Sequence, residues 1–226
     1  MSRLGEQRRA RLREARLYRV CDARGDEHEL GAFLDAALRG GVDVIQLREK
    51  GGESEAIVRA ARTFRAAADA HGALFVLNDR PDLVAATRAD GVHLGQDDAL
   101  PAEARALLGT DALIGRSTHT PTQLDAAATD ADVDYLAAGP VHATPTKPGR
   151  PAVGLDLIRH AASRPRRVPW FAIGGLAPDT LGPVVAAGAR RAVVVRALTE
   201  AADPEATART LRAALAAGQE ADADAA

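Results

Sequence analysis

Residues 42–79 read VDVIQLREKGGESEAIVRAARTFRAAADAHGALFVLND, a stretch in which two short apolar runs flank one amphipathic segment. The flanking runs, Val42 to Arg48 and Leu74 to Asp79, have the length and β-branched content of buried strands. The segment between them, Ser54 to His71, has helical periodicity. Its apolar face consists of Ile57, Ala60, Ala61, Phe64, Ala67 and Ala68. Strand, helix and strand in this order predict a βαβ unit with a parallel sheet.

The same alternation recurs along the chain, where eight apolar runs are separated by alanine-rich stretches. Eight strands alternating with helices predict an α/β fold of the (β/α)8 TIM-barrel class, and 226 residues are enough for one such domain. An open doubly wound sheet fits less well, because no G-x-G-x-x-G motif follows the first run. The eight runs are Leu17–Asp22, Val42–Arg48, Leu74–Asp79, Gly91–Leu94, Leu113–Ser117, Tyr135–Gly139, Trp170–Gly174 and Ala192–Ala197.

The two ends of the chain differ from the barrel in composition. Arginines crowd residues 1–16 and are interrupted by Glu6 and Glu14, which predicts an extra N-terminal leading helix rather than a signal peptide. Residues 217–226 combine acidic residues with alanine and contain no β-branched or aromatic residue. We therefore expect a leading helix over 1–16, the barrel catalytic domain over 17–216 and a disordered acidic tail over 217–226.

Composition also limits the partners. A net charge of −2 and an aromatic content of 3% argue against nucleic acid, and no apolar run is long enough to span a membrane. The lone cysteine, Cys21, cannot form an internal disulfide, so it is expected to be a small buried residue in a reducing, cytoplasmic setting. The sequence leaves homo-oligomer formation open.

Lysine and asparagine are rare in this chain. Lys50 and Lys147 are the only lysines among 29 basic residues, and Asn78 is the only asparagine. Lysine offers a compact ammonium where arginine offers a planar fork, so the two differ at a site that needs a point charge against a phosphate oxygen. Lys50 and Lys147 follow predicted strands and Asn78 lies at the end of one, and barrel chemistry sits at the carboxyl ends of strands.

The second run continues into Gln46, Arg48 and Lys50, which alternate and would share one face of an extended strand at the barrel mouth. Two inward cations and an amide predict an anionic ligand. The alternatives are an ion pair with Glu49, or a strand that ends early and leaves Lys50 solvated.

Carboxylates follow the third and fourth runs. Asp79 ends one run and Asp97 and Asp98 follow the next, so these groups can converge on Mg²⁺ together with substrate phosphate oxygens. The alternative is that Asp97 or Asp98 caps a helix beginning near Pro101.

The fifth run ends in Ser117, a hydroxyl suited to phosphate, and His119, two residues later, is expected to be structural or at the substrate edge. His93, within the fourth run, could point either way. The seventh run ends in Gly174 and Gly175, whose backbone amides, before a helix expected near Pro178, suit a phosphate.

The loop GPVHATPTKPG, residues 139–149, follows the sixth run. It places Thr144, Thr146 and Lys147 over the mouth, where they would clamp a phosphate when the loop closes. For His142 an acid–base role and a solvent-exposed role both remain open.

With these residues in order, the chain from Leu17 to Leu215 resembles the thiamine phosphate synthase family. The resemblance rests on QLREK, on LND with the later GQDD, on the strand-end Ser117, on TPTK and on IGG, all in the family's order and spacing. It implies a (β/α)8 transferase that joins 4-amino-2-methyl-5-(diphosphooxymethyl)pyrimidine to a thiazole phosphate, with Mg²⁺ as cofactor. Thiamine phosphate and pyrophosphate are the products.

The resemblance also implies roles for single residues. Asp79 and Asp98 would bind Mg²⁺, and Arg196 departs from the serine that many members carry. The pyrimidine diphosphate would be bound by Gln46, Leu47, Arg48, Glu49, Lys50, Asn78, Ser117 and Lys147, of which Arg48, Lys50, Ser117 and Lys147 would be catalytic. The thiazole phosphate would be bound by Thr144, Pro145, Thr146, Gly174, Gly175, Val195 and Arg196.

Two other functions remain as alternatives. A thiazole tautomerase-like barrel would share the phosphate site but would not need the diphosphate clamp. A non-catalytic barrel would bind a phosphorylated metabolite and release no pyrophosphate.

Overall fold

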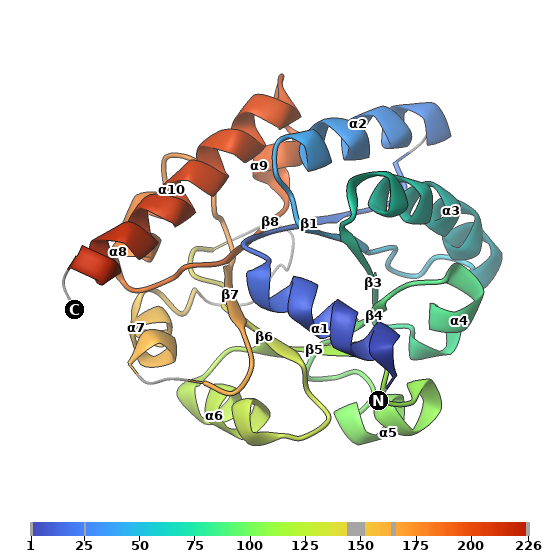
Figure 1. Cartoon of the computed structure of the whole chain (residues 1–226), viewed down its shortest axis with the longest axis horizontal. Helices are drawn as coiled ribbons and strands as arrows, with labels where there is room; N and C mark the ends of the chain where they lie inside the picture. The colour runs from blue at the N-terminus through green and yellow to red at the C-terminus, as the bar shows by residue number, and fades with distance from the viewer. Residues whose placement is uncertain (1, 25, 144–151, 164–165, 225–226) are drawn as a thin grey trace.

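The computed structural model describes residues 2–24, 26–143, 152–163 and 166–224, and its centre is a closed parallel barrel with strand order β1 to β8 (Figure 1). All eight predicted runs contain a strand, so the predicted barrel is confirmed. The strands are β1 (Leu17–Cys21), β2 (Val44–Leu47), β3 (Leu74–Asn78), β4 (Gly91–Leu94), β5 (Leu113–Thr118), β6 (Tyr135–Ala138), β7 (Trp170–Ile173) and β8 (Ala192–Val194).

Helices surround this barrel in Figure 1. They are α1 (Arg3–Glu14), α2 (Glu27–Arg39), α3 (Ser54–His71), η1 (Pro81–Leu83), α4 (Val84–Thr87), α5 (Pro101–Leu108), α6 (Pro121–Thr129), α7 (Asp156–Ala162), α8 (Leu181–Ala186), α9 (Arg196–Thr199) and α10 (Pro204–Asp224). Of α3, the helix of the opening stretch, Ile57, Ala61, Phe64 and Ala68 are buried, as their spacing predicts. Within the described ranges, no helix is both long and apolar enough to cross a membrane.

Alternation along the strands creates two cores. In β1, Tyr18 and Val20 belong to the cluster that fills the barrel, together with Phe171 of β7. Leu17 and Cys21 belong to the larger cluster between the barrel and its helices. Cys21 is buried, as expected. Successive side chains of a strand point to opposite faces, so each strand supports both cores.

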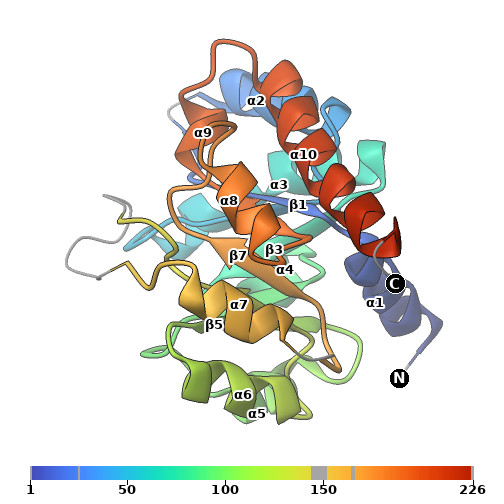
Figure 2. The same ribbon diagram turned by 90° about the vertical axis from the view of Figure 1, so that its left-hand side faces the viewer.

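The leading helix α1 closes the amino end of the barrel, and Figure 2 shows it on the side of the barrel opposite α9. Its Leu12 is 2% exposed and belongs to the cluster that fills the barrel. Arg8 Nε lies 2.9 Å from Asp90, the residue before β4, and Arg9 Nε lies 2.8 Å from Asp134, the residue before β6. Arg8 and Arg9 therefore anchor α1 to the residues that precede β4 and β6.

The acidic tail differs from the sequence prediction. The backbone of α10 continues to Asp224, so residues 217–224 are helical where a disordered tail was expected. Alanine, the strongest helix former, supports this extension. The helix starts at Pro204 and packs mainly against α2 and α8.

Candidate active site

Ser117 lies where three adjoining cavities meet at the carboxyl ends of the strands. The charged cavity is lined by Arg48, Lys50, Asn78, Asp79, His93, Gly95, Gln96, Asp97, Asp98 and Ser117. The floor cavity, inside the barrel, is lined chiefly by Tyr18, Gln46, Asn78, His93, Ser117 and Val193. The apolar cavity is lined chiefly by Ser117, His119, Pro140, Ile173, Gly174, Gly175, Leu176, Val193, Val195 and Arg196. The fold thus brings together residues at or just after the carboxyl ends of β2, β3, β4, β5, β6, β7 and β8.

Two cations from the end of β2 line the charged cavity. The strand ends at Leu47, so Arg48 and Lys50 lie on the following loop. Arg48 still lines the floor cavity beside Gln46, so the predicted shared face holds for these two residues, whereas Lys50 follows the alternative of a strand that ends early and leaves it exposed. Neither cation forms an ion pair with a described residue, and Glu49 instead accepts a hydrogen bond from the Ala23 amide at 3.0 Å. Within the described part of the chain, the positive charge of Arg48 and Lys50 in the charged cavity therefore has no ion-pair partner.

Carboxylates from the ends of β3 and β4 face the same cavity. Asp79 has a left-handed backbone with φ of 60°, a conformation that aspartate tolerates, and its amide donates to the His93 carbonyl at 2.9 Å. Asp98 accepts the Gly95 amide at 2.6 Å, whereas α5 is capped at Leu100, whose amide donates to Glu103. The alternative that Asp97 or Asp98 caps this helix is therefore wrong.

The donor set of this cavity fits Mg²⁺ only in part. Among the described residues, no three His, Cys, Asp or Glu side chains gather closely enough to hold a metal ion. Asp79 and Asp98 nevertheless line one cavity with Asn78, and Mg²⁺ is typically held by one or two carboxylates with water and substrate phosphate oxygens. The residues present are therefore compatible with an ion that arrives with a phosphorylated substrate.

A chain of buried polar side chains crosses the floor cavity. Gln46 Nε2 donates to the Tyr18 hydroxyl at 2.8 Å, and the hydroxyls of Tyr18 and Tyr135 lie 3.0 Å apart. His93 lies 3.2 Å from the Tyr135 hydroxyl through Nδ1 and 2.9 Å from Ser117 Oγ through Nε2. His93 thus points into the barrel, which settles its open orientation. Burial raises the pKa of Tyr18 and of Tyr135 well above the usual range, so both hydroxyls stay protonated at neutral pH.

Sequence reasoning missed Tyr18 and Tyr135. They are the only tyrosines of the chain, and each sits at an inward position of its predicted strand. Tyrosine is usually hydrogen-bonded when buried, so this inward pair was a usable signal.

The apolar cavity depends on two glycines after β7. Gly174 has φ of 110°, and a Cβ there would lie 2.5 Å from Cα of Pro140. Gly175 has φ of 65°, and its Cβ would lie 2.7 Å from Cβ of His142. A side chain at either glycine would therefore displace the backbone that shapes the cavity. The predicted helix after these glycines begins later, at Leu181 of α8, and a turn intervenes.

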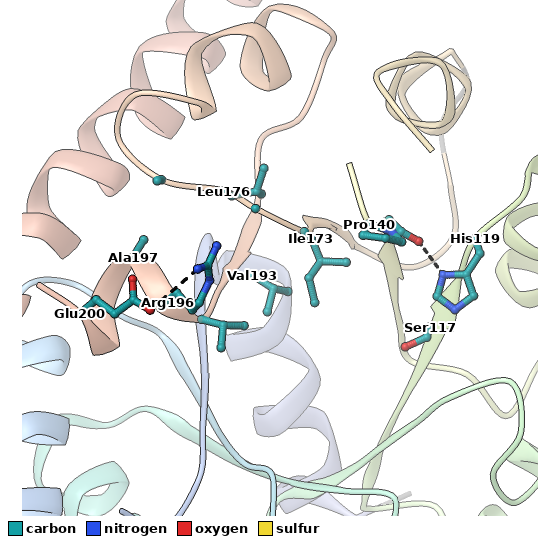
Figure 3. Close-up of a pocket in the computed structure, with 14 residues that line it drawn as sticks. Ser117, His119, Pro140, Ile173, Leu176, Val193, Arg196, Ala197 and Glu200 are labelled. Carbon is teal, nitrogen blue, oxygen red and sulfur yellow. Dashed lines mark hydrogen bonds and ion pairs between the residues drawn. The ribbon is translucent and has the colours of Figure 1, made fainter. Parts of the chain in front are cut away.

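The imidazole of His119 and the guanidinium of Arg196 stand at opposite sides of this cavity in Figure 3. His119 Nδ1 lies 2.5 Å from the Gly139 carbonyl, while Arg196 lies 3.9 Å from Glu200 one turn along. Ile173 and Val193 lie between these sides (Figure 3). The arrangement suits a small ring with an anionic substituent.

Several predicted site residues lie elsewhere. Leu47 is 1% exposed and packs in the core between the barrel and its helices, so its side chain lines none of the three cavities. The side chain of Glu49 does not line them either. The predictions for Thr144, Pro145, Thr146 and Lys147 lie outside the described residues. Gln46, Asn78, Val195 and Arg196 do line the mouth.

A closed barrel with hydrophilic groups gathered at the carboxyl ends of its strands defines the chain as a (β/α)8 barrel of the enzyme type. The family model for thiamine monophosphate synthase matches residues 17–198. The chain belongs to this family.

Individual relatives agree. The thiamine-phosphate synthase of Thermobifida fusca is 54% identical over 210 residues, which cover 92% of this chain and 96% of that protein. The thiamine-phosphate synthase of Mycolicibacterium smegmatis is 50% identical, with 92% and 95% covered. Among solved structures, the thiamine phosphate pyrophosphorylase of Pyrococcus furiosus aligns with a TM-score of 0.78 and 28% identity over 93% of this chain and 98% of that one.

Proposed function

We propose that this chain joins 4-amino-2-methyl-5-(diphosphooxymethyl)pyrimidine to a thiazole phosphate, giving thiamine phosphate and pyrophosphate. One observation carries the proposal: a cavity with two strand-end carboxylates and two cations that form no ion pair with a described residue meets an apolar cavity at Ser117. This coupling needs a diphosphate and an uncharged ring to be held on either side of one hydroxyl.

The charged cavity would hold the diphosphate. Arg48 and Lys50 have no competing ion pair in the described structure, so they are available to phosphate oxygens. Asp79 and Asp98 would hold Mg²⁺, and the chemistry supplied by the bound ion would be neutralisation of charge on the leaving group. Asn78 lies beside both groups and would bond the same substrate.

The floor cavity would hold the pyrimidine ring. Its Gln46 and His93 are members of one hydrogen-bonded chain, so their side chains are fixed before the ligand arrives. An aminopyrimidine carries both donors and acceptors and suits such a preorganised polar surface. The ring's methylene carbon would then lie near Ser117, between the diphosphate and the apolar cavity.

The apolar cavity would hold the thiazole ring, with its phosphate near the Gly174–Gly175 backbone and the Val195–Arg196 turn. Departure of the diphosphate leaves a positive methylene carbon, and the thiazole nitrogen attacks it. Protein side chains bind, orient and neutralise, and no protein nucleophile is needed. Ser117 would donate a hydrogen bond to the departing group.

The experiment is a pyrophosphate-release assay with both substrates and Mg²⁺. The expected result is release that requires both substrates, together with formation of thiamine phosphate. Binding of either substrate without release would support the non-catalytic alternative. Isomerisation of a thiazole phosphate without coupling would support the tautomerase alternative.

A further inference from the structure

Arg19 is a fully buried cation that forms no ion pair with any described carboxylate. It lies in β1 between Tyr18 and Val20, whose side chains fill the barrel, so its own side chain points outward. Its guanidinium lies 4.9 Å from the centre of the Phe33 ring of α2. Burial lowers the pKa of Arg19, and one donor, Nε, has no hydrogen-bond partner. Buried charges of this kind are rare, because removing a charged group from water has a large free-energy cost.

The guanidinium is bonded to the turn between β8 and α9. Nη1 donates to the carbonyls of Val195 at 2.7 Å, of Val194 at 3.3 Å and of Val20. Nη2 donates to Thr199 Oγ1, at the far end of α9. One side chain therefore holds both ends of this four-residue helix.

These bonds determine where the turn's amides point. In a trans peptide the C=O and N–H groups point in opposite directions, so a Val195 carbonyl directed at Arg19 turns the Arg196 N–H away from it. The first amides of a helix have no intrahelical acceptor. Arg196 and Ala197, which begin α9, line the apolar cavity.

We propose that Arg19 is a positioning residue for the phosphate of the thiazole substrate, an inference that rests on the proposed function. It holds the Val195–Arg196 turn with its amides toward the phosphate. It also places behind that turn a positive charge that no described carboxylate pairs with, and the phosphate supplies a counter-charge.

The test compares Arg19→Met with a matched control, Arg24→Met. Both guanidiniums lie over Phe33, at 4.9 Å and 4.6 Å, but only Arg19 donates to the β8–α9 turn. Arg19→Met should raise KM for the thiazole phosphate about 10-fold, the scale of one charged hydrogen bond. It should leave KM for the pyrimidine diphosphate unchanged. Arg24→Met should leave both constants unchanged.

A further measurement separates positioning from general damage. The inhibition constant of the dephosphorylated thiazole alcohol, measured in competition with the thiazole phosphate, should stay within about twofold of wild type in Arg19→Met. An equal loss of affinity for alcohol and phosphate would overturn the proposal. If Arg19→Met does not fold, Arg19→Lys and Thr199→Val replace it. Each should weaken only the phosphorylated ligand, and an unchanged KM in both would overturn the proposal. Failure of the proposed function is distinct, since it appears as absent pyrophosphate release in the wild type.

Discussion

Nε2 of His93 lies 2.9 Å from Oγ of Ser117, so a side chain of β4 fixes the hydroxyl at which the three cavities meet. The same imidazole is held from behind by the Tyr135 hydroxyl at 3.2 Å. A residue inside the barrel therefore controls the orientation of a residue at its mouth.

Tyr135→Phe should weaken both the fold and turnover. It removes the hydroxyl that bonds Tyr18 and His93, and leaving buried polar groups unsatisfied costs about 1–3 kcal/mol. Urea unfolding should show this loss, and pyrophosphate release should slow because Ser117 loses its fixed partner. Thr129→Val, which removes an exposed hydroxyl on α6, is the control and should change stability by less than about 0.5 kcal/mol. Wild-type stability and rate in Tyr135→Phe would contradict this role.

Asp79→Asn should raise the Mg²⁺ concentration needed for half-maximal activity at least about 10-fold, because a neutral amide is a weaker ligand for a hard cation. The measurement is a Mg²⁺ titration of pyrophosphate release at saturating substrates. Asp82→Asn, an exposed carboxylate paired with Arg80, is the control. An unchanged Mg²⁺ requirement in Asp79→Asn would remove Asp79 from the metal site.

Arg9→Met should destabilise the protein without impairing catalysis. Its ion pair with Asp134 is only 18% and 10% exposed at the two side chains, and Arg105 remains as a second partner 2.7 Å from the same carboxylate. The free energy of unfolding should fall by about 1–2 kcal/mol, which is less than the loss expected when a buried charge is left with no partner at all. Arg59→Met, from an exposed pair with Glu55, should change stability by less than about 1 kcal/mol. Both variants should retain wild-type KM values. A higher KM in Arg9→Met would show that α1 influences the active site at the opposite end of the barrel.

Stability should fall as pH rises above about 8.5, the pKa of an unfolded cysteine. Burial raises the pKa of Cys21 to about 11, so between these values the unfolded chain loses a proton that the folded chain keeps. The stabilisation from the protonated Cys21 thiol is fully present below pH 8.5 and is lost as the pH rises toward 11. Over this range the free energy of unfolding should fall by up to about 1.4 kcal/mol per pH unit. Tyr18 and Tyr135, whose pKa values burial also raises, add to the decline above about pH 10.

The check is urea unfolding from pH 7 to 10.5 for the wild type and Cys21→Ala. The variant is expected to be less stable at pH 7 but nearly flat between pH 8.5 and 10. Parallel curves for the two proteins would exclude Cys21 as the source of the alkaline loss.

The spacing of apolar runs along the chain was enough to predict the barrel. The eight apolar runs each contain a strand, because burial on both faces of a parallel strand requires continuous apolar residues. The strand-end positions of Asp79, Asp98 and Ser117 followed from this pattern, since carboxyl ends of parallel strands share one edge. The ends of elements were less predictable: β2 stops at Leu47 and α8 begins at Leu181, because tertiary contacts decide where pairing ends.

Only the tertiary structure revealed the contacts between residues far apart in sequence. The bonds from Gln46 to Tyr18, from Tyr135 to His93 and from Arg19 to Val195 join strands through side chains whose directions depend on barrel closure. The sequence by itself determined which residue types stand at the strand ends, because periodicity is local. The structure decided which of them meet, because contact depends on the shape of the closed barrel and on the packing of its two cores.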